Sequence, residues 1–392
     1  MNRGLPMLLW LLVVTAGGSG YGAATERVVR TPGELRAALA ELRPGTTVVI
    51  APGEYGSGYS LRGAAGTASA PILIRGEDPR RPPTFTGGPV GWALSDCSYV
   101  TLRGLTIRGA RVNGLNLDDG GTYQTPAHHL VLEDLTVEDV GPRGNFDGLK
   151  LSGVDDFTIR RCQITGWGGS AIDMVGCHRG VVEDCYFTGK EGFSQANGVQ
   201  MKGGSSEILV QSSVFEHAGQ RAVNLGGSTG LPFFRPAPGT YEASKITVAG
   251  NRFLGSLAPI AWVNADGGRF HRNTVLFPDR WVVRVLQEQT DPRFQPCRGG
   301  LFEENLVVHD RKVAAHVNVG PGTASETFTF RKNAWFRVDG PSRPQLPTPE
   351  EGGVYGVDPL LDRPTSAQAR ITSRDPRLQG IGADAYKRPV RR

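Results

Sequence analysis

One strand motif recurs along most of this chain, and it limits the folds that the chain can adopt. Each copy carries apolar residues at alternate positions, then a small or amide marker residue, then a second short apolar stretch. The steps between markers vary from 22 residues (Asn251 to Asn273) to 38 residues (Ser213 to Asn251). Fixed strands joined by loops of variable length are typical of solenoids. The predicted markers are Gly104, Asp134, Cys162, Cys185, Ser213, Asn251, Asn273, Asn305 and Asn333.

A second strand precedes the first in each repeat. Its apolar residues alternate with polar ones, which sends one set inward and the other outward. No helical segment separates these strands, so a doubly wound α/β fold is excluded. The pattern predicts an all-β, single-stranded right-handed parallel β-helix. The copies of the second strand cover residues 114–117, 148–151, 171–174, 198–201 and 222–225.

The marker positions predict a stack inside the solenoid. The last four markers are asparagines, and stacked amides can bond each other and the neighbouring backbone. Cys162 and Cys185 are expected in the same stack as small apolar fillers rather than as redox groups. The chain has five cysteines, so at least one has no partner within the chain.

The ends of the chain differ from the repeat. Residues 1–24 combine Arg3, a short apolar run and small residues, which predicts a signal peptide and a secreted, periplasmic or cell-surface protein. Residues 25–340 are expected to form the β-helix domain, with a capping helix over 31–44 that begins after Thr31. Residues 341–392 are expected to be an irregular extension, partly disordered from about residue 380.

Stacking the second strands predicts a groove on their outward face. One column contains only glycine and alanine, and we expect it to form the floor. The next column is wholly polar and would form a hydrogen-bonding wall that suits a polysaccharide. Beyond residue 226, the side chains of Arg284, Gln287, Glu288, His316 and Asn318 either extend this groove or face solvent. The polar column contains Asn116, Lys150, Asp173, Gln200 and Asn224, and Asp147, Asn197, Arg221 and His217 lie at the adjoining turns.

Three cations, Lys150, Lys202 and Arg221, are predicted to converge within neighbouring coils of this groove. Crowded cations lower the pKa of a lysine, which would make it a usable base, and they also form a receptor for a carboxylate. The net charge of +5 agrees with an acidic polysaccharide as partner. An exported protein is not expected to bind nucleic acid, and no transmembrane segment is expected after signal cleavage. We expect a monomer.

The opening of the β-helix resembles a known family. Residues 51–55 read Ala-Pro-Gly-Glu-Tyr, and residues 66–75 read Gly-Thr-Ala-Ser-Ala-Pro-Ile-Leu-Ile-Arg. This is similar to the "PGxY … GTAxxPIxIR" pattern of secreted β-helix polysaccharide lyases of the chondroitinase B and alginate lyase group. The resemblance implies cleavage of a uronate-containing polysaccharide by β-elimination.

The resemblance also implies roles for individual residues. In that group a lysine abstracts the uronate C5 proton, an arginine one coil later assists, and calcium neutralises the substrate carboxylate. Residues 197–202 resemble the family segment that runs from a glutamate to this lysine. Lys202, or else Lys150, would then be the base, and Asn197 would occupy a calcium-ligand position. The arginine position falls on Gly226, so Arg221 is the nearest candidate.

Other functions remain open from the sequence. A non-catalytic carbohydrate-binding or surface β-helix protein would share the groove, since a fold does not imply catalysis. A glycoside hydrolase would need grouped aspartates, and the hydrolase motifs expected on this fold are missing. A uronate epimerase would share the base chemistry of the lyase. Calcium ligands are expected among the oxygen donors of Asp118, Asp119, Asp147, Asp155, Asp156 and Asp173.

Overall fold

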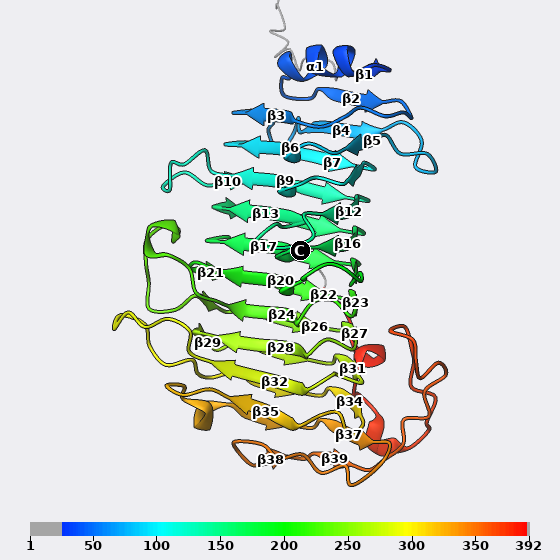
Figure 1. Ribbon diagram of the computed structural model, residues 1–392, viewed down its shortest axis with the longest axis vertical. Helices are drawn as coiled ribbons and strands as arrows, with labels where there is room; N and C mark the ends of the chain where they lie inside the picture. Colours follow the sequence, from blue (N-terminus) through cyan, green and yellow to red (C-terminus); the bar gives the residue numbers. More distant parts are fainter. Residues whose placement is uncertain (1–25, 390–392) are drawn as a thin grey trace, which may run out of the picture.

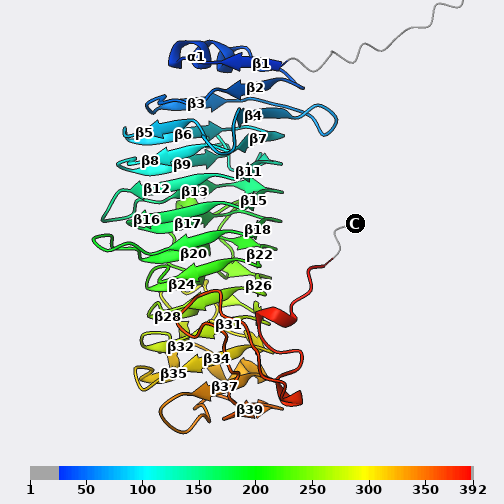
Figure 2. The same ribbon diagram turned by 90° about the vertical axis from the view of Figure 1, so that its right-hand side faces the viewer.

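The strands stack as coils of one parallel solenoid. The computed structural model describes residues 26–389, and the predicted signal peptide lies outside them. Three long parallel sheets run along the axis and enclose a single apolar core (Figures 1 and 2). Each coil contributes one strand to each sheet, so the predicted parallel β-helix is confirmed. The helix found in residues 26–389 is too short to cross a membrane.

The first sheet, called sheet A, carries the first-strand motif. Its inward residues are the alternate apolar positions of the repeat, such as Leu132, Ile159 and Val182. Its strands are β1 (Glu26–Val29), β2 (Thr47–Ile50), β4 (Ile72–Gly76), β7 (Val100–Arg103), β11 (Val131–Glu133), β15 (Thr158–Arg160), β18 (Val181–Glu183), β22 (Leu209–Gln211), β26 (Thr247–Ala249), β30 (Arg269–His271), β33 (Leu301–Glu303), β36 (Thr329–Arg331) and β38 (Glu350–Glu351).

The second sheet, sheet B, follows sheet A after a tight bend in each coil. Its strands are β5 (Thr84–Thr86), β8 (Thr106–Arg108), β12 (Thr136–Val140), β16 (Gln163–Trp167), β19 (Tyr186–Thr188), β23 (Val214–Glu216), β27 (Arg252–Leu254), β31 (Thr274–Leu276), β34 (Leu306–His309), β37 (Ala334–Arg337) and β39 (Val354–Tyr355). Because the coils continue to Tyr355, the β-helix extends past the expected boundary at residue 340.

The third sheet, sheet C, contains the second-strand motif. Its strands are β3 (Tyr59–Arg62), β6 (Val90–Ser95), β9 (Asn113–Asp118), β13 (Leu149–Ser152), β17 (Ser170–Val175), β20 (Asn197–Lys202), β24 (Arg221–Gly226), β28 (Ala258–Val263), β32 (Trp281–Leu286) and β35 (Ala315–Val319). Short bridging strands join the coils at one corner, namely β10 (Ala127–His128), β14 (Val154–Asp155), β21 (Ser205–Ser206), β25 (Ala243–Ser244) and β29 (Ala265–Asp266).

The register of sheet C agrees with the predicted alignment. Leu149 pairs with Leu115 on one side and with Ile172 on the other, and Val199 pairs with Ile172 and Val223. Each outward residue therefore lies beside its counterpart in the next coil. The residues of the predicted polar column follow one another along the axis in the predicted order.

The bend between sheets A and B shows where the predicted register was wrong. Leu132 pairs with Ile159, which places Leu135, not Asp134, beside Cys162. The residue before each inward marker takes a left-handed conformation, as Asp134 (φ 55°) and Asp184 (φ 56°) show. This turn directs the following side chain inward, so Leu105 and Leu135 fill the first two positions of the stack and both are buried.

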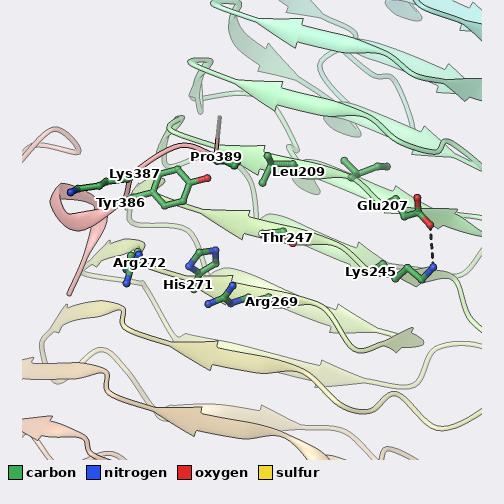
Figure 3. Close-up of a pocket in the computed structure, with 11 residues that line it drawn as sticks. Glu207, Leu209, Lys245, Thr247, Arg269, His271, Arg272, Tyr386, Lys387 and Pro389 are labelled. Carbon is green, nitrogen blue, oxygen red and sulfur yellow. Dashed lines mark hydrogen bonds and ion pairs between the residues drawn. The ribbon is translucent and has the colours of Figure 1, made fainter. Parts of the chain in front are cut away.

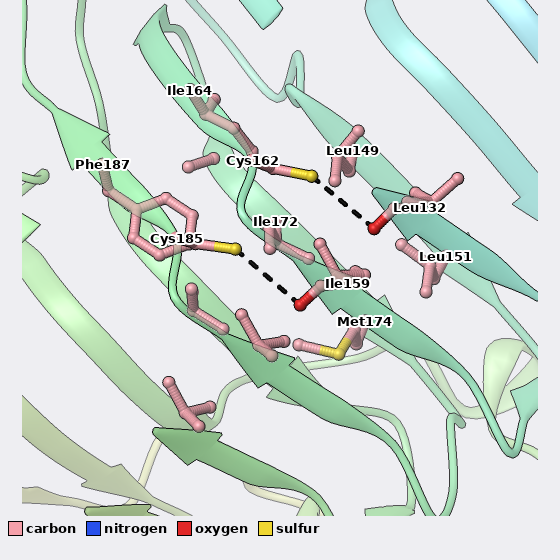
Figure 4. Packing of buried hydrophobic residues seen from close by; sticks show 14 of the residues in the cluster. Leu132, Leu149, Leu151, Ile159, Cys162, Ile164, Ile172, Met174, Cys185 and Phe187 are labelled. Atoms are coloured by element: carbon pink, nitrogen blue, oxygen red, sulfur yellow. Dashed lines mark hydrogen bonds between the residues drawn. The ribbon is translucent and has the colours of Figure 1, made fainter. Parts of the chain in front are cut away.

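The stack itself is confirmed. Cys162 and Cys185 point inward among apolar side chains, and their thiols donate weak bonds to the carbonyls of Leu132 and Ile159 (Figure 4). All five cysteines are unpaired and buried. Burial raises the pKa of Cys177 to about 12 and that of Cys97 to about 11, so these thiols are inert at neutral pH.

The asparagine ladder continues the stack. Asn273 Oδ1 accepts from the backbone N–H of Asn251 at 2.8 Å and from its Nδ2 at 3.1 Å. Asn273 Nδ2 donates to Val248 O at 3.0 Å, and the same pattern repeats at Asn305 and Asn333. Each amide satisfies backbone groups at the bend that water cannot reach.

A helix covers the N-terminal end of the solenoid. Helix α1 (Pro32–Ala40) packs Leu35 and Ala38 on the first coil, and Thr31 Oγ1 accepts from Glu34 N at 3.2 Å as predicted. The helix ends four residues earlier than residue 44. Three-residue 3₁₀ turns occur at η1 (Leu231–Phe233), η2 (Ser325–Thr327), η3 (Pro376–Leu378) and η4 (Ala383–Ala385).

The C-terminal segment is not the loose extension that the sequence predicted. It returns along the outer face of sheet B (Figures 1 and 2) and buries Leu378 and Ile381 against Leu276 and Leu306. Beyond residue 380, Tyr386 Oη donates to Gln211 Oε1 at 2.7 Å. Apolar outward residues on sheet B hold this segment in place.

We predict that Asn273→Ala destabilises the protein by about 3 kcal/mol, because it leaves the Asn251 N–H and the Val248 carbonyl buried without a partner. Urea unfolding followed by circular dichroism measures the loss. Gln220→Ala, which changes an exposed amide, is the control and should leave the unfolding free energy within about 0.5 kcal/mol. Equal stability of the two variants would contradict a structural role for the ladder.

Candidate active site

Two lysines and two aspartates meet on the outward face of sheet C. Lys150 on β13 forms ion pairs with Asp173 on β17 and, at 3.4 Å, with Asp147 at the turn before β13. Lys202, the last residue of β20, lies 3.1 Å from the other oxygen of Asp173. One carboxylate therefore holds two ammonium groups from coils on either side of it. This set, Asp147, Lys150, Asp173 and Lys202, is called the lysine–aspartate cluster below.

Burial differs sharply between the members of this cluster. The side chains of Asp173 and Asp147 are 0% and 1% exposed, whereas those of Lys150 and Lys202 are 23% and 15% exposed. The aspartates lie beneath, and the lysines form the surface. A ligand that approaches this face therefore meets positive charge first.

The electrostatics of the cluster contradict one expectation. Burial alone would lower the pKa of Lys150, but Asp173 and Asp147 outweigh it and raise that pKa above its ordinary value. The predicted lowering by crowded cations is therefore wrong for Lys150, which stays protonated at neutral pH. Burial, and secondly the charge of Asp173, raise the pKa of Asp147 to about 6.

Gln200 and Asn197 link this cluster to the next turn. Gln200 Oε1 accepts from Lys202 Nζ at 3.3 Å and from Asn197 Nδ2 at 3.1 Å, and Gln200 Nε2 donates to Gly226 O at 3.0 Å. Both amide side chains are almost fully buried. They orient Lys202 and are not free to bind substrate.

A hollow of about 420 Å³ opens in front of the two lysines. Lys150 and Lys202 line one side of it, and the loop 227–242, which follows β24, lines the other with Thr229 and Phe233. A volume of this size falls within the range of ordinary ligand pockets. The sequence analysis missed this loop as part of the site, although the longest step between markers, from Ser213 to Asn251, signals an insertion there.

The predicted open groove is wrong in two respects. The glycine and alanine column is buried at the inner corner of the coil, where Ala171 and Ala222 belong to the apolar core. The polar column is also covered at its last predicted member, since Asn224 is fully buried. Loops that follow sheet C overhang the face, and the accessible part is the hollow at the lysines.

The remaining predicted residues lie outside the lysine–aspartate cluster. Arg221 begins β24, beside Asn197 in register, and forms an ion pair of 2.7 Å with Glu288. Arg221 therefore lies at the level of Asn197, which is five positions before Lys202 on β20, or roughly 16 Å along the strand. His217 is exposed on the turn before β24, and Asn116 accepts a hydrogen bond from Asn113. The predicted convergence of Arg221 with the two lysines is therefore wrong.

Arg221 belongs instead to a second polar group further along sheet C. Arg284 lies close enough to Arg221 and Glu288 for their charges to act on it, and its guanidinium donates to Asn318 at 3.0 Å. It also lies 4.5 Å from the ring centroid of Trp281. The predicted continuation of the polar face beyond residue 226 therefore exists at Arg284 and Asn318.

Calcium does not fit this site. Asn197 Nδ2 faces Ser170 and Gln200, and its neighbour in the next coil is the cation Arg221. Asp118 accepts from Ser95 Oγ and Gly120 N, and each of the other candidate carboxylates holds a basic side chain, as the pairs of Asp119 with Arg235 and Asp156 with Arg179 illustrate. Over residues 26–389 no group of three or more metal-ligating side chains comes together. No step of the chemistry is routed through a metal here.

Gly226 occupies the position where the resemblance implied an arginine. It has φ 98°, and a Cβ atom there would lie 1.8 Å from Val263 O. Only glycine tolerates this conformation at such a close approach. An arginine is therefore sterically excluded from the position beside Lys202.

A larger hollow, of about 520 Å³, lies on the outer face of sheet A next to the C-terminal segment (Figure 3). Two of its cations are already paired, Lys245 with Glu207 at 3.1 Å and Arg272 with Glu304 at 2.9 Å. Burial, and secondly Arg269, lower the pKa of His271 to about 4, so this histidine is neutral at pH 7. No acid–base pair converges in it, and the lysine–aspartate cluster remains the better candidate.

The comparisons agree with the fold. A family model for the right-handed β-helix region matches residues 91–275. No curated protein matches the sequence.

Solved structures with a similar fold include several polysaccharide lyases. An alginate lyase from Paenibacillus sp. str. FPU-7 is 19% identical and aligns with a TM-score of 0.51 over 76% of this chain and 96% of its own. A family 6 polysaccharide lyase from Pseudopedobacter saltans is 12% identical, with a TM-score of 0.53 over 92% and 99%. A rhamnogalacturonan lyase is 14% identical, with a TM-score of 0.54 over 77% and 82%. This chain is a right-handed parallel β-helix protein whose fold resembles that of polysaccharide lyases.

We predict that the raised pKa of Asp147 makes stability depend on pH. The folded pKa of about 6 exceeds the unfolded value, so the folded state binds more protons between about pH 4 and 6, and stability falls as the pH rises through this window. Relative to Asp147→Asn, the unfolding free energy of the wild type should increase by about 1 kcal/mol from pH 7 to pH 5.

Chemical unfolding at the two pH values measures this difference. Glu326→Gln, which changes an exposed carboxylate, is the control and should follow the wild type at both pH values. A constant difference between wild type and Asp147→Asn would show that Asp147 has an ordinary pKa.

Proposed function

We propose that this protein is a polysaccharide lyase that cleaves a uronate-containing polysaccharide by β-elimination. The observation that carries the proposal is the pair of lysines held by Asp173 at the edge of one hollow. Elimination needs neutralisation of the substrate carboxylate and a base for the C5 proton. Two neighbouring lysines, one to receive the carboxylate and the other to act as base, supply both in this proposal.

The two lysines have different environments, and this difference assigns their roles. Lys150 contacts two carboxylates, which raise its pKa, so it remains charged and receives the substrate carboxylate. Lys202 contacts only one carboxylate, and its other contact is the neutral amide of Gln200. Lys202 is therefore the base of the proposed reaction.

The reaction balances without a cofactor. Neutral Lys202 removes the proton from C5, the electron pair forms the C4=C5 double bond, and the C4–O bond breaks. The departing oxygen needs a proton, and the ammonium that Lys202 has become lies in the same hollow. Lys150 stabilises the negative charge that develops on the carboxylate as the C5 proton leaves.

A hydrolase on this site is less well supported. Inverting and retaining glycosidases need two carboxyl groups that face the scissile bond. Asp147 and Asp173 are buried beneath the lysines and do not face the hollow. A proton abstraction reaction fits the exposed groups better than an acid–base pair of carboxylates. Because the proposed substrate is a polymer found outside cells, we also propose that the protein acts outside the cytoplasm.

We predict that Lys202→Ala lowers kcat/KM at least about 100-fold, because general base catalysis contributes that much or more. The assay follows the ultraviolet absorbance of the unsaturated product on a panel of alginate, polygalacturonate and chondroitin. Lys150→Ala should raise KM and also lower kcat, because Lys150 both binds the substrate carboxylate and stabilises the charge that develops on it. Lys245→Ala, which changes an exposed lysine on sheet A, should leave activity unchanged.

The panel also separates the other functions. Reducing sugar without absorbance indicates a hydrolase, and an altered uronate without cleavage indicates an epimerase. Binding without any product indicates a non-catalytic protein. A Lys202→Ala variant with full lyase activity would remove Lys202 from the mechanism.

A further inference from the structure

Phe233 stands at the rim of the hollow with its ring exposed. Its exposure is 59%, and within residues 26–389 it is the one aromatic residue among the large apolar side chains that are exposed. The same hollow is lined by Lys150 and Lys202. Single exposed apolar residues are common on proteins, so exposure alone decides nothing. The contacts that hold the Phe233 ring in place indicate whether its exposure serves binding.

The loop that carries Phe233 is anchored by a buried ion pair. Arg235, two residues after Phe233, donates from Nε to Asp119 at 2.5 Å and from Nη1 to Phe233 O at 2.9 Å. Its guanidinium lies 3.7 Å from the ring centroid of Tyr123. The loop is thereby fixed to a segment more than 100 residues earlier in the sequence. Gly176 allows this contact, because a Cβ there would lie 2.2 Å from Arg235 Cβ.

A second anchor holds the two ends of the loop together. Glu242 is fully buried, and its carboxylate accepts from Gly203 N at 2.7 Å and from Thr229 N at 2.6 Å. It also accepts from Thr229 Oγ1 at 2.7 Å. Phe234 points the other way, is buried, and lies 5.7 Å from the ring of Phe294. The loop is therefore built to keep Phe234 inside and Phe233 outside.

The ring of Phe233 rests on the backbone of its own turn. A Cβ atom at Gly230 would lie 3.2 Å from Phe233 Cδ2, so the ring packs directly on this glycine. The other side is left open. An aromatic ring that is held in place before binding loses little conformational entropy when a ligand covers it.

We propose that Phe233 is a stacking platform for a pyranose ring, and that Lys150 binds the carboxylate of the same saccharide chain. This inference rests on the proposed function, since it assigns the substrate class of that site. The C–H face of a pyranose is apolar and covers an aromatic ring well, while its equatorial groups remain available to Lys150 and Lys202. The chemistry recognised is a uronate pyranoside: an apolar ring face together with a carboxylate.

Calorimetry with oligosaccharides of mannuronate, guluronate and galacturonate tests the platform, with uncharged maltohexaose as a comparison ligand. The measurements use the full chain carrying Lys202→Ala, so that no ligand is consumed. In this background Phe233→Ala should weaken binding of the best uronate ligand about tenfold, and Phe233→Trp should keep it within about threefold. Leu360→Ala, which removes an exposed apolar side chain elsewhere, should change nothing.

Thermal unfolding of each variant separates loss of binding from loss of fold, because removal of an exposed ring should leave the melting temperature unchanged. Binding that is equally strong with Ala and Phe at position 233 would overturn the platform, and so would a failure of all three uronate ligands to bind. Maltohexaose bound as tightly as the uronates would overturn the role of Lys150 in recognition.

The two proposals can fail separately. If no polymer of the panel yields unsaturated product but Phe233→Ala weakens uronate binding, the platform stands and the lyase proposal falls. If the lyase assay succeeds and Phe233→Ala binds like its parent, the lyase proposal stands and the platform falls.

Discussion

Hydrogen bonding between successive coils is the constraint on which the rest of this structure depends. Parallel strands pair at about 4.8 Å, so each residue lies beside the residue at the same position of the next coil. Residues at the same position of successive coils therefore form a column, and each residue must pack favourably against the residues before and after it in that column. Inside the solenoid this favours apolar residues or amides that bond each other. Asn251, Asn273, Asn305 and Asn333 form such a column and satisfy the backbone at a bend that water does not reach.

The same constraint generates the chemistry on the outside. Lysines in adjacent coils would repel each other, whereas Asp173 lies between the coils of Lys150 and Lys202 and pairs with both. Burial of Asp173 is tolerated because two ammonium groups compensate its charge. The lysines are thereby drawn to one hollow and held there. Among residues 26–389, Asp147 has Lys150 as its one ion-pair partner, at 3.4 Å, and burial, followed by the charge of Asp173, raises the pKa of its carboxyl.

Loops decide which part of a long polar face is a site. The coils repeat the same outward positions from Asn116 to Asn318, and a hollow of about 420 Å³ opens beside Lys150 and Lys202. The loop 227–242 forms its opposite wall, and that loop is fixed by Arg235 and Glu242, which pair with residues of other coils. A repetitive scaffold with one anchored insertion is sufficient to create a unique place on it.

The sequence by itself determined the coil and its register in sheet C, because a period of two residues and recurring markers report directly which side chains share a face. It also placed Asp173 next to Lys150 in one column and predicted that Lys150 and Lys202 converge, since stacking converts spacing into proximity. It assigned Asp134 to the inward stack, although the next residue, Leu135, occupies that position. The reason is that a left-handed residue at the bend changes the direction of the next side chain without any signature in composition. Only the tertiary structure decided the rest. The glycine and alanine column turned inward at a corner, Arg221 paired with Glu288 further along the face, and Arg235 joined Asp119 across more than 100 residues. Such contacts depend on how loops of irregular length close in space, and no local pattern of residues encodes that closure.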